Sequence, residues 1–121
     1  MDIRTEKLIE IGVDVQIVVN RLGGNEALYL SLCKKFLYDN NFKLLQNALI
    51  SQNFTAAEGF AHTLKGIAAN LGFTSLEILS RSLLQDIRLQ DFRSLEYHNT
   101  YLTEEYFRIN TVLMEISNPE C

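Results

Sequence analysis

His62 and Lys65 are the residues whose types and spacing most directly suggest chemistry. They lie three positions apart in Phe60–Gly72, a segment with helical spacing, so their side chains project from the same helix face. A neutral imidazole is a nucleophile towards phosphorus, and much of a free histidine population is neutral at cytoplasmic pH. A phosphoryl group in transfer carries negative charge on its equatorial oxygens, which a nearby ammonium stabilises. The pair therefore predicts a site that accepts and steadies a phosphoryl group.

Two glycines, Gly59 and Gly66, flank His62 on this predicted helix face. On a 3.6-residue period His62 points away from the apolar stripe of the helix, so we expect it to be exposed. The stripe consists of Phe60, Ala61, Leu64, Ile67, Ala68 and Leu71, and the outer neighbours of His62 are Glu58, Gly59, Lys65, Gly66 and Ala69. An exposed helix position has no packing reason to use glycine, which costs about 1 kcal/mol relative to alanine. We interpret the glycines as lowering the surface around the imidazole for a bulky partner; close helix–helix contact through small residues is the alternative.

The elements that position this segment are predicted to be helices, because apolar residues recur at helical spacing and no strand pattern occurs. The first expected helices run from Ile3 to near Gly12, from the cap Asp14 to Leu22, and from the cap Asn25 to Leu49 with a kink or short break at Asp39–Asn41. The later ones run from near Thr55 to Leu71, from Thr74 or Ser75 to Ile87, and, after a link at Gln90–Arg93, from Leu95 to the end at Asn118-Pro119. We expect one all-α domain over residues 1–121, an antiparallel up-down four-helix bundle with short additional N-terminal helices.

Composition limits the classes of partner. The chain has 11 basic and 15 acidic residues, a net charge of −4 and no basic stripe, which argues against nucleic acid. No apolar run could span a bilayer and the first residues do not form a signal peptide, so we expect a soluble cytoplasmic protein without a membrane partner. Cys33 and Cys121 lack metal-ligand spacing, and we expect reduced thiols, with Cys33 filling space in the core. A closed bundle with a mostly polar exterior should be monomeric.

The stretch His62-Thr63-Leu64-Lys65-Gly66, followed by Leu71-Gly72, resembles the phosphorylation motif of histidine phosphotransfer (HPt) domains. A weaker match lies at Arg21-Leu22-Gly23-Gly24-Asn25-Glu26, and the resemblance spans roughly Gly12 to Arg88. It implies that His62 is the phosphoacceptor of a two-component multistep phosphorelay, that Lys65 steadies the phosphoryl group and that Gly66 leaves room for the partner.

The resemblance also implies the partners, which are response-regulator receiver domains and a sensor or hybrid histidine kinase. Such a carrier has no kinase or phosphatase activity of its own and no cofactor, since the receiver supplies both the aspartate and the bound magnesium. The sequence agrees, because it contains no glycine-rich nucleotide loop and no cluster of carboxylates suited to a metal.

One position departs from the family pattern. Many members carry a polar side chain on the next helix that reaches towards the histidine, and the corresponding residue here is Leu84, with Gln85 beside it. We therefore expect a different orientation of the ring, or a contact from Gln85. Arg81 and Arg88 share a helix face with Leu84 and are candidates for a rim around the partner, with solvated arginines as the alternative. The expected partner contacts are Glu58, Gly59, Ala69, Arg81, Gln85 and Arg88.

Other residues are interpreted as structural. His98 lies at the edge of an apolar helix face, which favours a partly buried structural histidine over a zinc ligand. The aromatic residues Tyr97, Tyr101, Tyr106 and Phe107 are expected in core and boundary positions. Two other functions stay open at this point: a helical docking module without phosphotransfer, against which the intact histidine motif argues, and a helical enzyme or metal protein, for which the sequence offers no ligand set.

Overall fold

The computed structural model describes residues 2–117, which form seven helices and no strand. The helices are α1 Ile3–Glu10, α2 Val15–Arg21, α3 Glu26–Phe36, α4 Asn41–Ile50, α5 Phe54–Leu71, α6 Thr74–Leu89 and α7 Phe92–Ser117. The predicted all-helical class is confirmed for these residues. Within them, no helix has both the length and the apolar character needed to cross a membrane. The predicted end at Asn118-Pro119 and the interpretation of Cys121 lie outside the described residues.

The expected break at Asp39–Asn41 divides the long third element into α3 and α4. The Asp39 carboxylate accepts hydrogen bonds from the backbone N–H of Asn41 at 2.9 Å and from its side-chain amide at 3.0 Å. Such local bonds compete with continuation of a helix. The predicted cap of α3 is also confirmed, because the Asn25 side chain accepts a hydrogen bond from the N–H of Leu28 at 2.9 Å.

One helix start and one predicted side-chain cap differ from the predictions. α7 begins at Phe92, within the expected link, because the Asp91 carboxylate accepts a hydrogen bond from the N–H of Ser94 at 3.2 Å and so satisfies its first turn. Asp14 does lie at the start of α2, but its side chain makes no capping bond there. Its carboxylate accepts instead from the Thr74 hydroxyl at 2.6 Å, so Asp14 joins α2 to the start of α6.

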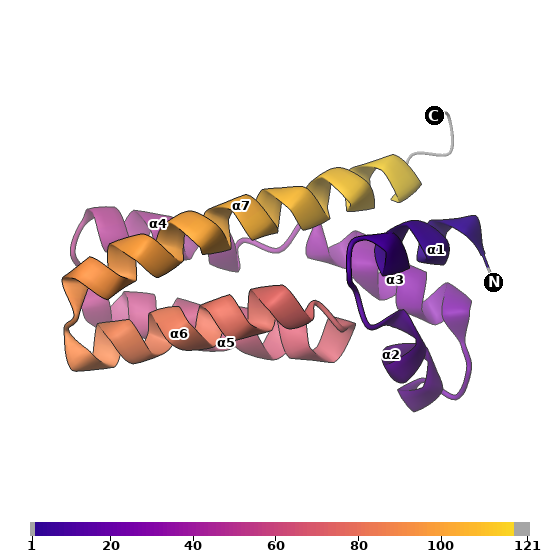
Figure 1. Ribbon diagram of the computed structural model, residues 1–121, viewed down its shortest axis with the longest axis horizontal. Coiled ribbons are helices and arrows are strands. Elements are labelled where there is room, and N and C mark those ends of the chain that lie inside the picture. Colours follow the sequence, from indigo (N-terminus) through magenta and orange to yellow (C-terminus); the bar gives the residue numbers. More distant parts are fainter. Residues whose placement is uncertain (1, 118–121) are drawn as a thin grey trace.

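The helices pack together around one hydrophobic core. α5 packs against α4 and α6, and α6 packs against α7; Figure 1 shows these four helices side by side, with α1, α2 and α3 gathered at one end. Side chains connect α4 to α7, since the rings of Phe42 and Tyr106 stack with centroids 3.9 Å apart and Gln46 and Asn99 exchange two amide hydrogen bonds of 2.9 Å. The largest fully buried side chains include Leu8, Tyr29, Leu45, Leu64, Phe73, Leu76, Leu83, Leu84, Leu102, Ile109 and Leu113.

A seam of hydrogen bonds ties the C-terminal end of α5 to the N-terminal helices. Gly72 ends α5 with a φ of 79°, and its carbonyl accepts a hydrogen bond from the N–H of Asp14 at 2.9 Å. A Cβ atom on Gly72 would lie 2.8 Å from the carbonyl oxygen of Asp14, so both the backbone angle and the space require glycine. Beside it the hydroxyl of Tyr29 donates to the carbonyl of Leu71 at 2.8 Å. The seam fixes one end of the helix that carries His62.

The aromatic residues of α7 follow the predicted packing only in part. Tyr106 is half-buried, whereas Tyr97, Tyr101 and Phe107 are exposed. The prediction was wrong for these three because only one face of α7 meets the other helices. Cys33 is 1% exposed, as expected for a packing residue, and burial raises the pKa of its thiol to about 12.

Candidate functional site

The two faces predicted for α5 are confirmed. Its inner residues Ala61, Leu64, Ala68 and Leu71 are buried, while Phe60 and Ile67, expected in the same stripe, are half-buried at its edges. His62 is exposed on the opposite face, and within residues 2–117 its imidazole makes no hydrogen bond with another side chain or with the backbone. The imidazole is therefore not engaged by another group of these residues.

Gly59 and Gly66 border the imidazole on an open surface. A Cβ atom added at either glycine would meet no atom of a neighbouring element within 4 Å. The glycines therefore make no close helix–helix contact within residues 2–117. The alternative interpretation, close packing of helices through small residues, is wrong for these residues. Neither packing nor a positive φ requires glycine at these two positions. The effect of the two glycines is to leave an open surface on both sides of His62.

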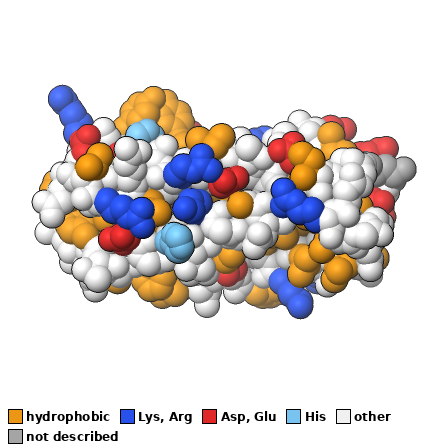
Figure 2. All heavy atoms as spheres, turned by 90° about the horizontal axis from the view of Figure 1, so that it is seen from below, with side chains coloured by type: hydrophobic (Ala, Val, Ile, Leu, Met, Phe, Trp, Pro, Cys, Tyr) orange, Lys and Arg blue, Asp and Glu red, His pale blue; other side chains and the backbone are white. Residues whose placement is uncertain are grey.

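Basic side chains near this face differ in whether they are paired. Arg81 donates to Glu77 on its own helix at 2.6 Å, and Arg88 donates to Glu58 of α5 at 2.9 Å. Lys65, which is half-buried one turn after His62, forms no ion pair within residues 2–117. Its ammonium is thus not engaged by a carboxylate of these residues, and Lys65 shares the helix face of His62. Figure 2 shows a face of the molecule on which a histidine is exposed among basic and acidic side chains.

The structure brings only some of the predicted site residues together. Leu84 is 2% exposed and points into the core, so it does not reach the imidazole. Gln85 is exposed and forms no hydrogen bond with His62, and Arg81 turns to its own helix. From α6, Arg88 alone of the predicted residues is bonded to α5. The remaining predicted contact, Ala69, is half-buried one turn beyond Lys65.

Sequence reasoning missed the partner of the second histidine. His98 is half-buried, and its Nδ1 lies 2.6 Å from Oδ2 of Asp86, a carboxylate that is 7% exposed. The pair joins α6 to α7, which supports the structural interpretation of His98. A signal was available, because Asp86 lies beside Ile87 on an apolar helix face, where an acid needs a polar partner. No group of three or more metal-ligating side chains occurs among residues 2–117.

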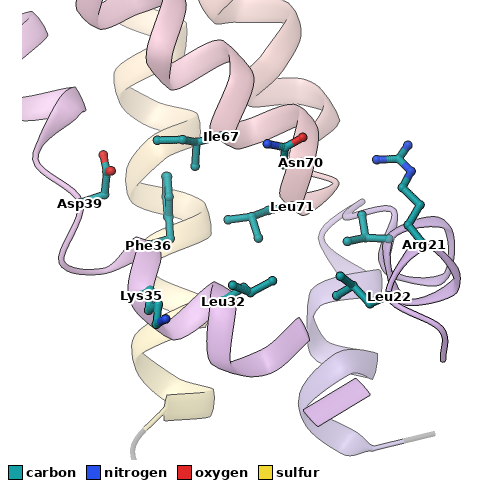
Figure 3. Close-up of a pocket in the computed structure, with 10 residues that line it drawn as sticks. Arg21, Leu22, Leu32, Lys35, Phe36, Asp39, Ile67, Asn70 and Leu71 are labelled. Carbon is teal, nitrogen blue, oxygen red and sulfur yellow. The ribbon is translucent and has the colours of Figure 1, made fainter. Parts of the chain in front are cut away.

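A hollow of about 480 Å³ between α2, α3 and α5 was also not predicted (Figure 3). Its apolar walls are Val18, Leu22, Leu32, Phe36, Ile67 and Leu71, and its polar lining residues are Arg21, Lys35, Asp39 and Asn70. Three separate helices contribute to it, so no spacing within one segment could reveal it. None of His62, Lys65 and Gly66 lines the hollow, which is therefore distinct from the candidate site.

Comparisons with protein-family models, with curated proteins and with solved structures find no match to this chain. The functional assignment therefore depends on the residues around His62 and on their geometry.

Proposed function

We propose that this chain is a histidine phosphotransfer module that carries a phosphoryl group on His62 between the aspartates of receiver domains. One observation supports this more than any other. His62 is an exposed histidine with no hydrogen-bond partner in residues 2–117, between two glycines that leave an open surface and one turn before an unpaired ammonium. A structural histidine needs none of these features, and His98, which is bonded to Asp86, has a different environment.

The proposed reaction is a reversible in-line transfer. The unprotonated ring nitrogen of His62 attacks the phosphorus of a receiver aspartyl phosphate, an N–P bond forms, and the O–P bond breaks to release the aspartate carboxylate. The ring proton on the other nitrogen of His62 then passes to solvent. The ammonium of Lys65 stabilises the charge on the phosphoryl oxygens, and the open surface at Gly66 admits the receiver's loops. A second receiver aspartate removes the phosphoryl group by the reverse steps.

The proposal includes the architecture and the partners. α4, α5, α6 and α7 form an antiparallel up-down four-helix bundle, and residues 1–121 are one monomeric domain. The partners are receiver domains and a sensor or hybrid kinase, in the cytoplasm. The chain itself is a carrier without kinase or phosphatase activity, and the magnesium belongs to the receiver.

Phosphoryl transfer from a labelled receiver domain tests the proposal. We expect a label on this chain that survives alkali, is lost in acid and is absent in His62→Gln. Because His62 is exposed and unbonded, that variant should keep its helical circular dichroism and its melting temperature. Acceptance of the label by His62→Gln would refute the assignment, and no transfer from several receivers to a folded protein would favour a docking module.

The role of Lys65 has its own test. Lys65→Ala should slow transfer about tenfold, since a charge-assisted contact contributes about 1.5 kcal/mol, while the dissociation constant for the receiver changes less. Lys43→Ala, which removes an exposed lysine of α4, is the matched control and should transfer normally. Equal rates for the two variants would show that Lys65 does not act on the phosphoryl group.

A further inference from the structure

One ion pair connects α6 to the helix face that carries His62. Arg88 Nε donates to Oε1 of Glu58 at 2.9 Å, and Glu58 lies one turn before His62 on α5. Residues four apart on a helix have Cβ atoms about 5–6 Å apart, so the guanidinium bonded to Glu58 is within side-chain reach of the imidazole. The two side chains are 55% and 42% exposed, which leaves both free to rearrange in solvent.

Phosphorylation would change the charge balance of this pair. A phosphoryl group at neutral pH adds close to two negative charges, and on His62 these would lie one turn from the Glu58 carboxylate. The guanidinium of Arg88 has five N–H donors, of which the bond to Glu58 uses one. Donors therefore remain for phosphoryl oxygens, and arginine suits such oxygens because of its planar arrangement of donors.

We propose that Glu58 and Arg88 form a phosphoryl-sensing pair, in which Arg88 moves from Glu58 to the phosphoryl group once His62 is phosphorylated. This inference rests on the proposed function of His62. Arg88 stabilises the phosphohistidine, and Glu58 opposes it by repulsion, so the pair sets the lifetime of the carrier. Leu84 of α6 is buried in the core, whereas Arg88, one turn further along that helix, is bonded to α5 and lies where its guanidinium can reach the phosphoryl group.

The lifetime of the phosphohistidine in the full chain measures this directly. Phosphoramidate is a small donor whose P–N bond breaks with release of ammonia as the N–P bond to His62 forms, so no partner protein is needed. After removal of the donor, the half-life is followed at constant pH in wild type, Arg88→Gln, Arg88→Lys and Glu58→Gln, and mass spectrometry confirms the label on His62. Arg108→Gln is the matched control, because Arg108 also pairs with a glutamate of its own helix, Glu105 at 2.7 Å, but lies on α7.

We expect Arg88→Gln to shorten the half-life about threefold and Glu58→Gln to lengthen it about threefold, the effect of one screened unit charge at this separation in water. Arg88→Lys should restore much of the lifetime, and Arg108→Gln should leave it unchanged. In 1 M KCl, where the Debye length falls to about 3 Å, the differences should largely disappear. A purely structural role of the ion pair would alter the melting temperature but not this salt-dependent lifetime.

The outcomes separate this inference from the proposed function. A labelled His62 with equal half-lives in all variants overturns the phosphoryl-sensing pair and leaves the carrier function intact. No label on His62 in the wild type overturns both. If Arg88→Gln does not fold, Glu58→Gln decides the matter, because an unchanged or shortened lifetime in that variant contradicts the proposed repulsion.

Discussion

Replacing Gly66 by alanine should stabilise the fold, although Gly66 belongs to the His62–Gly66 segment that resembles a phosphorylation motif. A Cβ atom at this position meets nothing within 4 Å, so the change introduces no clash. Alanine in a helix interior is favoured over glycine by about 1 kcal/mol. For a chain of 121 residues that gain corresponds to a rise in melting temperature of about 4 °C. Thermal unfolding followed by circular dichroism measures it, and Gly59→Ala, the other open glycine of α5, should show a similar rise.

The variant Gly66→Gln, with a larger side chain, separates the effect of this position on fold stability from its effect on the approach of the receiver domain. Glutamine is also a good helix former, so the fold should again be at least as stable as the wild type. Its side chain would fill the open surface beside His62 and should greatly slow transfer from a receiver domain. Phosphoramidate, which is small, should still label His62 at the normal rate. The contrast between the two donors reports steric exclusion of the protein partner and not a damaged imidazole.

Two results would refute this reasoning about Gly66. Loss of stability in Gly66→Ala would mean that the glycine has a packing or conformational role. Normal transfer from a receiver to Gly66→Gln would mean that the open surface is not needed for the approach of the partner. Unfolding curves for both variants are needed alongside the transfer rates, so that a folding defect is not mistaken for steric exclusion.

The other predictions concern the core and the seam. Gly72→Ala should lower the free energy of unfolding by about 2 kcal/mol or more in denaturant titrations, because alanine must adopt a positive φ and its Cβ meets the Asp14 carbonyl; an unchanged midpoint would contradict this. Asp86→Ala should cost about 1–3 kcal/mol through loss of the buried bond to His98, and a neutral effect in the same titration would show that the pair is dispensable. In a Cys121→Ser background, Cys33 should react with Ellman's reagent only as the protein unfolds. Burial raises its pKa to about 12, so the native thiol stays protonated; its contribution to stability is present below about pH 9 and is lost as the pH rises towards 12.

The helix face that carries His62 could be predicted because the information lies within one segment. The 3.6-residue period of Ala61, Leu64, Ala68 and Leu71 fixes the buried face, and His62 must then point outward. The break at Asp39–Asn41 was predictable for the same reason, since the hydrogen bonds between Asp39 and Asn41, at the start of α4, join residues two apart. Local chemistry decides such features, so the sequence carries them directly.

Contacts between helices could not be predicted in this way. The 3.6-residue helical period places Glu58 and Arg88 on the outer faces of their own helices. It does not reveal that α5 and α6 pack at an angle that brings these two side chains into an ion pair. Asp14 is a similar case, because a residue suited to cap its own helix bonds to Thr74 instead. The exposure of Phe107 depends on which side of α7 meets α4, and that is a property of the packed molecule.

The seam at Gly72 also bears on the order in which the chain folds. It joins Asp14 of the N-terminal region to the end of α5, whereas α5, α6 and α7 pack against their neighbours along the chain. Closing a long loop costs more chain entropy than pairing consecutive helices, so we expect α5, α6 and α7 to assemble first and α1 and α2 to dock late. In the native protein, amides in the last turn of α5 should then exchange with solvent together with those of α2, because both become exposed when the seam opens. The C-terminal end of α5 would thus become ordered and disordered together with the N-terminal helices. His62 lies more than two turns before that end of α5.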